Sequence, residues 1–259
     1  MLAIDASFGV ISGVRNPAPL LAPGLALDAR GVARRFGARW VLRGVNLQVR
    51  AGEIVGLLGH NGCGKSTLLR IVATLLKASA GDAYVFGANV KTEGDDVRRN
   101  IGFFAHVPGL YDDLTARENL SFAATMLGLP AADIDAALER VGLTHVARER
   151  VRGFSAGMQR RLSLARLVLQ RPRFLLLDEP YNNLDTAGIA LMNGFIRELG
   201  EAGGAALIVV HDLATATPVL ERTVTIRDGR IDTATAADAA HLPGSPEPSI
   251  VPTGAAGIS

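Results

Sequence analysis

The chain has 259 residues, 48% of them hydrophobic, which is enough to bury a substantial core in one large domain or in a domain with an embedded subdomain. The 27 basic and 25 acidic residues are interspersed, so the composition does not favour a protein that binds nucleic acid. A single cysteine, Cys63, excludes an internal disulfide framework and indicates a reducing compartment, which we take to be the cytoplasm.

The two ends of the chain differ from its middle in composition. Residues 1–24 contain prolines and glycines that break a long helix and have no basic segment ahead of their apolar residues, so we expect a flexible extension rather than a signal peptide. Residues 233–259 are rich in Ala, Gly, Pro and Ser, and we expect a disordered tail. Elsewhere, Gly, Pro or charged residues interrupt each apolar stretch before the roughly 20 residues that a membrane-spanning helix needs.

Between these ends, residues 25–232 alternate short apolar segments with helical patterns. We predict strands in the segments VNLQV, EIVGLLG, FLLLD, ALIVV and VTIRDG, and a helix from Lys65. Such apolar segments are typical of buried parallel strands, so the predicted fold class is α/β, with a mixed sheet whose parallel core is flanked by helices. The segments TARENLSFAATML and AADIDAALERVG have helical spacing with no strand between them, and they predict a helical subdomain inserted at about 90–154.

A glycine-rich loop joins the predicted strand EIVGLLG to the helix that begins at Lys65. It has the spacing of a P-loop, in which glycines let backbone N–H groups converge on phosphate oxygens and the helix N-terminus adds positive potential. Lys65 supplies a point charge, and the Ser66 hydroxyl can bind Mg²⁺. The residues assigned to nucleotide binding are Gly59, His60, Asn61, Gly62, Cys63, Gly64, Lys65, Ser66 and Thr67. The alternative is a glycine-rich turn without a function.

Cys63 lies among these backbone amides, which would stabilise a thiolate. We therefore expect maleimide to alkylate its thiol in the nucleotide-free protein, and Mg-ATP to shield it. A buried, unreactive thiol is the alternative.

Two carboxylates stand at the end of the segment FLLLDEP. Asp178 ends the predicted strand and Glu179 follows it. With a P-loop upstream, we predict that Asp178 holds the Mg²⁺ shell and that Glu179 polarises the attacking water. The alternative is that Asp-Glu-Pro only leads the chain from a strand into a turn.

A second element suited to an anion opens the helix in FSAGMQRRLSLARLVLQRP. Ser155 has the chemistry of an N-cap, and the N–H groups of Ser155, Ala156 and Gly157 can face an anion. A helix start of this kind is also common where its role is only structural.

Together, these motifs resemble those of the ATP-binding cassette (ABC) ATPases over about 25–230. The motifs, in chain order, are Gly59 to Thr67, Ser155 to Arg161, Asp178 to Pro180, Asn183 to Asp185, and His211 with Asp212. The resemblance implies a head-to-tail dimer with two ATP molecules between the subunits, each P-loop facing Ser155 and Gly157 of the other chain. The signature departs from commoner members at Phe154, Ala156 and Met158, where many have Leu, Gly and Gln.

The resemblance also assigns roles to single residues outside the P-loop. Phe36 would stack on adenine, Asp185 would link the two sites across the dimer, and His211 would contact the γ-phosphate. Trp40 is the rival for the adenine contact. The structural alternatives are a core position for Phe36, a helix cap for Asp185 and a strand-end position for His211.

The segment IGFFAHVPGLYDDLTARENL places His106 where ABC proteins usually have a glutamine that senses nucleotide and reports to the membrane partner. The segment is similar to the ATP-binding subunit of the haem exporter of cytochrome c maturation. The similarity rests on His106 and on the Pro-Gly, Leu-Thr and Glu-Asn-Leu that follow it. Imidazole is a poor Mg²⁺ ligand, so we expect His106 to act through a water or the γ-phosphate. A loop histidine without nucleotide contact is the alternative.

The resemblance thus implies an ATPase that uses ATP and Mg²⁺ to power a separate membrane-spanning partner, with haem export as the expected transport. A drug or antibiotic exporter is the first alternative. A non-transport ABC protein acting on nucleic acid or translation would normally carry two cassettes or a coiled-coil insertion, and a P-loop GTPase would carry an Asn-Lys-x-Asp segment. The sequence has none of these. We expect a homodimer, or a pair with a similar chain, at the cytoplasmic face of the cell membrane, with membrane contact through the partner only and no nucleic acid.

Overall fold

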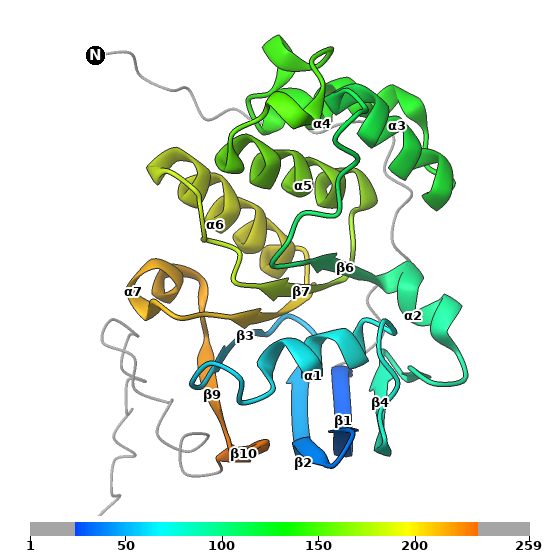
Figure 1. Ribbon diagram of the computed structural model, residues 1–259, viewed down its shortest axis with the longest axis vertical. Helices are drawn as coiled ribbons and strands as arrows, with labels where there is room; N and C mark the ends of the chain where they lie inside the picture. Colours follow the sequence, from blue (N-terminus) through cyan, green and yellow to red (C-terminus); the bar gives the residue numbers. More distant parts are fainter. Residues whose placement is uncertain (1–23, 233–259) are drawn as a thin grey trace, which may run out of the picture.

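The computed structural model describes residues 24–232, in which two sheets and seven α-helices lie in layers (Figure 1). The expected flexible segments 1–24 and 233–259 lie outside the described residues, apart from Gly24. Over the described range, no helix has the length and apolar character needed to cross a bilayer.

An antiparallel sheet of four strands forms the lower layer in Figure 1, in the order β2-β1-β4-β5. Its strands are β1 (Leu25–Phe36), β2 (Arg39–Arg50), β4 (Ala80–Val85) and β5 (Ala88–Asn89). The predicted strand VNLQV is part of the longer β2, where Val45, Leu47 and Val49 are buried and the residues between them are exposed. This alternation buries one face of the sheet.

The central sheet has six strands in the order β10-β9-β3-β8-β7-β6. Its strands are β3 (Ile54–Leu58), β6 (Ile101–Phe104), β7 (Phe174–Asp178), β8 (Ala205–Val209), β9 (Arg222–Arg227) and β10 (Arg230–Asp232). Strands β9, β3, β8, β7 and β6 run parallel, and β10 pairs antiparallel with β9. The predicted class, an α/β fold with a mixed sheet and a parallel core, is confirmed.

Each face of the central sheet contributes to a separate hydrophobic core, because successive side chains of a strand point to opposite faces. On β7, Phe174 and Leu176 join one core, whereas Leu175 and Leu177 join the other. The first core is closed by helix α1 (Lys65–Val72) and the antiparallel sheet. The second is closed by helices α3 (Ala116–Leu127), α4 (Ile134–Arg140), α5 (Ala156–Gln170) and α6 (Thr186–Glu201). Helices α2 (Gly94–Asn100) and α7 (Leu213–Ala216) complete the α-helices of the described chain.

The helices α3 and α4 lie within the two segments predicted to be helical. Helix α3 begins at a capping box, in which the Thr115 side chain accepts from the Glu118 N–H and the Glu118 carboxylate accepts from the Thr115 N–H. The expected helical range of 90–154 is nevertheless too wide at its start, because β6 belongs to the central sheet. That strand has only four residues, and its Gly102 packs so close to α5 that a Cβ would lie 2.9 Å from Leu167.

Candidate active site

The carboxyl ends of four neighbouring parallel strands meet at one edge of the central sheet. Strand β3 ends at Leu58 and leads into the P-loop, and β7 ends at Asp178, which Glu179 follows. His106 and His211 each lie two residues beyond the ends of β6 and β8. In open α/β sheets this edge is the usual place for a ligand site.

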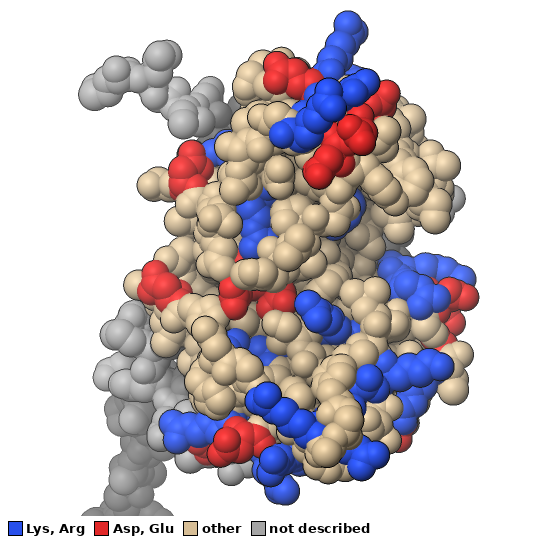
Figure 2. All heavy atoms as spheres, in the orientation of Figure 1, with Lys and Arg blue, Asp and Glu red and all other residues tan. Residues whose placement is uncertain are grey.

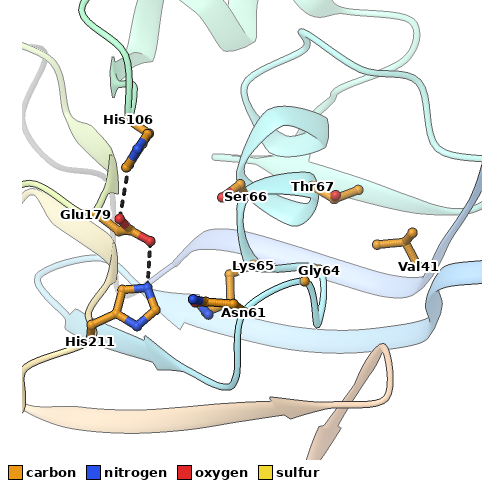
Figure 3. A pocket seen from close by; sticks show the side chains of 10 residues that line it. Val41, Asn61, Gly64, Lys65, Ser66, Thr67, His106, Glu179 and His211 are labelled. Atoms are coloured by element: carbon orange, nitrogen blue, oxygen red, sulfur yellow. Dashed lines mark hydrogen bonds and ion pairs between the residues drawn. The ribbon is translucent and has the colours of Figure 1, made fainter.

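These strand ends surround a cavity of about 510 Å³ (Figure 3), a size typical of small-molecule sites. Its wall consists of Val41, Asn61, Gly62, Gly64, Lys65, Ser66, Thr67, His106, Glu179 and His211. The structure therefore brings together most of the predicted P-loop, one predicted carboxylate, and two of the three predicted histidines, His106 and His211. Gly59, His60 and Cys63 of the P-loop are not part of this wall.

The P-loop backbone adopts a path that requires glycine at two places. Gly59 has φ of +142°, and a Cβ there would collide with the carbonyl of Ile226. Gly64 has φ of +113°, and its Cβ would lie 2.6 Å from Leu42. Because side chains are excluded from both positions, the loop can turn tightly between β3 and α1.

Lys65 is the first residue of α1 and is only 5% exposed. Its ammonium group donates to the carbonyl oxygens of Gly59, at 2.6 Å, and His60, at 3.0 Å. The loop therefore holds a positive charge on the cavity wall, where phosphate oxygens are suitable acceptors. The side chain of His60 makes a separate contact, in which its Nδ1 lies 2.9 Å from the carbonyl oxygen of Asn61.

The expectation that Cys63 is open to alkylation is wrong. Its side chain is 3% exposed and belongs to the core that α1 closes against the antiparallel sheet. The thiol fills the space beside Gly59, where a Cβ would lie 2.7 Å from the Cys63 sulfur. Cys63 thus has the chemistry of a small, buried apolar residue.

Glu179 lies at the centre of a group of hydrogen bonds (Figure 3). Its Oε1 is 2.6 Å from His211 Nε2, and its Oε2 is 3.0 Å from His106 Nδ1. Asn182 donates its side-chain N–H to Oε2 at 2.7 Å. Glu179 also has φ of +52°, an uncommon conformation for a residue other than glycine.

These contacts determine the charge state of Glu179. Burial by itself raises the pKa of this carboxyl, but the hydrogen bond and charge of His211, with His106 and Asn182, outweigh burial and lower the net pKa below its ordinary value. The ionised form can accept a proton, so Glu179 remains a base into the acid range.

His106 faces Glu179 in this structure. Because a carboxylate only accepts hydrogen bonds, the Nδ1 of His106 must donate. The expected contact of His106 with a water or the γ-phosphate stays a prediction.

Asp178 lies deeper than Glu179 and does not line the cavity. Its Oδ1 accepts from the Ser66 hydroxyl at 3.0 Å, and its Oδ2 is buried without a hydrogen-bond partner. Burial raises the pKa of Asp178, and the charge of Glu179 adds to this despite the Ser66 hydrogen bond. A buried carboxylate oxygen without a partner, next to a serine hydroxyl, suits a hard cation such as Mg²⁺.

Further Mg²⁺ ligands would come from bound phosphates. No group of three or more His, Cys, Asp and Glu residues suited to a metal occurs between residues 24 and 232. Mg²⁺ typically takes one or two protein oxygens and completes its shell with phosphate and water. The pair of Asp178 and Ser66 fits that pattern.

The two candidates for the adenine contact lie at the turn between β1 and β2. Phe36 is 45% exposed, which excludes the core position, and Trp40 is 41% exposed. The guanidinium of Arg34 lies 4.6 Å from the Phe36 ring centre, and that of Arg35 lies 5.7 Å from the Trp40 ring. Neither aromatic ring lines the cavity, so the geometry does not choose between them.

Ser155, Gly157 and Asp185 lie outside the cavity wall of their own chain. The Ser155 hydroxyl caps α5 by accepting from the Met158 N–H at 3.2 Å. Asp185 caps α6, accepting from the Gly188 N–H at 2.8 Å, and its carboxylate pairs with Arg161 at 2.7 Å. One chain therefore does not bring these residues to its own P-loop.

Arg160 is a buried charged residue that the motifs did not single out. Its guanidinium lies beneath the loops that carry His106 and Glu179. The adjacent arginines Arg160 and Arg161 give no local indication of which one is buried, because that depends on how α5 is rotated against the sheet.

Charged side chains are unevenly distributed on the face shown in Figure 2. Lys and Arg are frequent over its lower half, where α1 and the antiparallel sheet lie, whereas the helical upper part carries both signs side by side. The P-loop belongs to the more basic half, which favours an anionic ligand.

Comparison with known proteins decides the family. The family described as "ABC transporter" matches residues 42–182. The chain belongs to the ABC transporter family. It is thus the ATP-binding subunit of an ABC transporter and an ABC-type ATPase, as the motifs predicted.

Three ABC proteins illustrate the range of relatives. "Cytochrome c biogenesis ATP-binding export protein CcmA" of Xanthomonas campestris pv. campestris (strain 8004) is 38% identical over 84% of this chain and 98% of that protein. "Bacitracin transport ATP-binding protein BcrA" of Bacillus licheniformis is 36% identical over 77% of this chain and 66% of that protein. The dimeric, post-hydrolysis structure of the ATP-binding cassette MJ0796 with ADP and Pi superposes with a TM-score of 0.72, at 26% identity over 80% of this chain and 96% of that chain.

Proposed function

We propose that this ABC ATPase hydrolyses ATP in the cavity between the P-loop and Glu179. The observation that carries the proposal is the position of the Glu179 carboxyl group on the cavity wall with the P-loop, held by His106 and His211. Lys65 and the loop N–H groups bind the phosphates, and Glu179 accepts a proton from the attacking water. Asp178 and Ser66 would hold Mg²⁺, which would supply positive charge beside the phosphates.

The working form in this proposal is a dimer. Ser155, Gly157 and Asp185 are surface residues away from their own cavity, so a second subunit is needed to bring an anion-binding helix start to each P-loop. The dimeric MJ0796 structure supports this arrangement. Phe36 stacks on the adenine ring in this reading, Asp185 links the two sites, and His211 turns from Glu179 to the γ-phosphate.

Dimerisation is tested by the dependence of ATPase rate on protein concentration. In dilute solution, the rate per chain is expected to rise with concentration, because the active site is complete only between two chains. Gel filtration with bound ATP provides the second measurement. A fully active monomer would contradict the proposed dimer.

A membrane-spanning partner is part of the proposal. An apolar depression of about 370 Å³ lies between the helical layer and the edge of the central sheet, and its wall includes the exposed side chains of Leu75, Tyr111, Phe122, Met126 and Leu127. Exposed apolar surface of this kind is typical of an interaction site. We place the permease there, with the subunit at the cytoplasmic face of the cell membrane.

Haem export is the transport that we propose. It is supported by the segment around His106 and by the identity of 38% to the cytochrome c biogenesis protein. The bacitracin transport protein is almost as similar, at 36%, so a drug or antibiotic exporter is the second candidate. A pull-down of this subunit from solubilised membranes, followed by identification of the permease, separates the two. Loss of c-type cytochromes in a deletion strain would support haem export, and unchanged cytochromes with new drug sensitivity would reject it.

His106→Gln is expected to keep turnover within about threefold of wild type at mildly alkaline pH, because a glutamine N–H can still donate to Glu179. On acidification, the variant should lose activity at a higher pH than wild type. The reason is that the charge of His106 helps to lower the pKa of Glu179, and without it the base is protonated sooner.

The measurement is kcat at saturating ATP across the pH range, for wild type, His106→Gln and His106→Ala. His106→Ala should show the same shift and a larger loss of kcat, because its donor is absent, with little change in ATP affinity. Superimposable pH profiles would reject the contact between His106 and Glu179 as a determinant of turnover.

A further inference from the structure

Arg160 lies on α5, one and a half turns after the Ser155 cap, and is only 2% exposed. Its guanidinium donates to three backbone carbonyl oxygens, those of Ala105 at 2.7 Å, Glu179 at 2.8 Å and Asn182 at 3.2 Å. The group also lies 4.8 Å from the ring centre of Phe104. One side chain therefore joins α5 to three separate points on two loops.

Each of these carbonyls adjoins a residue of the proposed mechanism. Ala105 precedes His106, Glu179 is the proposed base, and Asn182 supplies a side-chain hydrogen bond to the Glu179 carboxylate. Glu179 is in the left-handed region of φ, which side chains disfavour, so external contacts must hold it there. The hydrogen bond that the Arg160 guanidinium donates to the Glu179 carbonyl oxygen is such a contact.

Burying the Arg160 guanidinium costs more free energy of folding than packing alone would justify. Burial lowers the pKa of Arg160, and the negative charges of Asp178 and Glu179 offset this only in part. The hydrogen-bond partners of Arg160 are neutral carbonyls, and none of them is a carboxylate. For the free energy of folding, a buried charge of this kind is less favourable than an apolar side chain of similar size. A planar group with several fixed donors is, however, well suited to hold three carbonyls in one geometry.

We infer that Arg160 is a positioning residue for hydrolysis: it fixes the backbone on both sides of the Glu179 carboxylate and ties it to the helix that begins at Ser155. This inference rests on the proposed role of Glu179 as the base. In this inference Arg160 does not contact the nucleotide. Replacing Arg160 should therefore slow the chemical step and leave the affinity for ATP unchanged.

The inference also concerns communication in the proposed dimer. The start of α5 faces the nucleotide of the second subunit, whereas Glu179 acts on the nucleotide of its own chain. Arg160 lies between the two and contacts the loop of Asn182, which leads to Asp185. A shift of α5 on closure of the dimer would therefore move the Glu179 backbone with it.

The test compares Arg160→Lys and Arg160→Gln with the matched control Arg173→Gln. Arg173 is half-buried, lies 4.2 Å from the ring centre of Phe86 and donates to Asn100, but it precedes the start of β7, at the far end of the strand from Asp178. Three quantities are measured for each variant: kcat, the dissociation constant of a fluorescent ATP analogue, and the melting temperature.

Both Arg160 variants are expected to lower kcat by about 10- to 100-fold and to change the dissociation constant by less than about threefold, because only the alignment of the base is lost. Lysine keeps the charge but cannot span three carbonyls, so Arg160→Lys should still lose turnover, and it keeps the test decisive if Arg160→Gln fails to fold. The control should lower the melting temperature without a comparable loss of kcat.

Two outcomes would overturn the inference: wild-type kcat in Arg160→Lys, or a loss of ATP affinity that parallels the loss of kcat. Glu179→Gln, measured beside these variants, tests the proposed function separately. If Glu179→Gln keeps wild-type turnover, the proposed role of Glu179 as the base is wrong, whatever kcat the Arg160 variants have. If Glu179→Gln is inactive and the Arg160 variants are not, only the positioning role fails.

Discussion

Glu179→Gln is expected to reduce kcat by about 10²- to 10⁴-fold, because a neutral amide cannot take a proton from water. The change preserves the shape of the side chain and leaves an oxygen that can accept from Asn182 and His106, so the cavity keeps its form. ATP should still bind, since Lys65 and the loop N–H groups are untouched. The trapped nucleotide should then hold two subunits together.

Released phosphate and the elution volume with bound ATP measure these two effects. Glu198→Gln is the matched control, because Glu198 pairs with Arg140 on the surface of α6, outside the cavity wall. The control should keep wild-type turnover and should not accumulate dimers. Turnover by Glu179→Gln close to that of wild type would show that another group is the base.

Lys65→Ala is expected to weaken ATP binding by about 100-fold or more, because the variant removes a nearly buried positive charge from the cavity wall. A ligand that binds only the folded state stabilises it by about 2.7 kcal/mol at 100 times its dissociation constant. Mg-ATP should therefore raise the melting temperature of wild type and leave that of Lys65→Ala nearly unchanged.

Thermal unfolding with and without Mg-ATP is the measurement, at one fixed protein concentration. Lys77→Ala is the control, because Lys77 is exposed and lies beyond α1. A nucleotide-dependent shift in Lys65→Ala equal to that of wild type would contradict the assigned role. A variant that is already unstable without nucleotide would show that the bonds from Lys65 to Gly59 and His60 hold the empty loop together.

The local part of the site could be predicted from the sequence. The P-loop is one contiguous segment whose glycines and lysine identify it, and Asp178 and Glu179 follow an apolar strand that is easy to recognise. The same is true of the α/β class, because the segments FLLLD and ALIVV are almost wholly apolar and correspond to buried strands.

The contacts between distant segments could not be predicted in this way. His106 and His211 reach the same carboxylate because β6 and β8 flank β7, and strand order is a property of the whole sheet. Cys63 is buried where its sulfur fills the space beside Gly59, which also lies against the backbone carbonyl of Ile226 in β9. Strand β6 was missed because a four-residue strand that contains glycine has little apolar periodicity.

The length of β7 sets both the packing of the two cores and the position of the two carboxylates. Its residues alternate between the cores, and the last of them is Asp178, with Glu179 immediately beyond. A one-residue insertion into β7 would exchange the faces of the leucines and also move Asp178 away from Ser66. We therefore expect homologues to differ in this strand by substitution, and to carry insertions or deletions in the loops on either side of it.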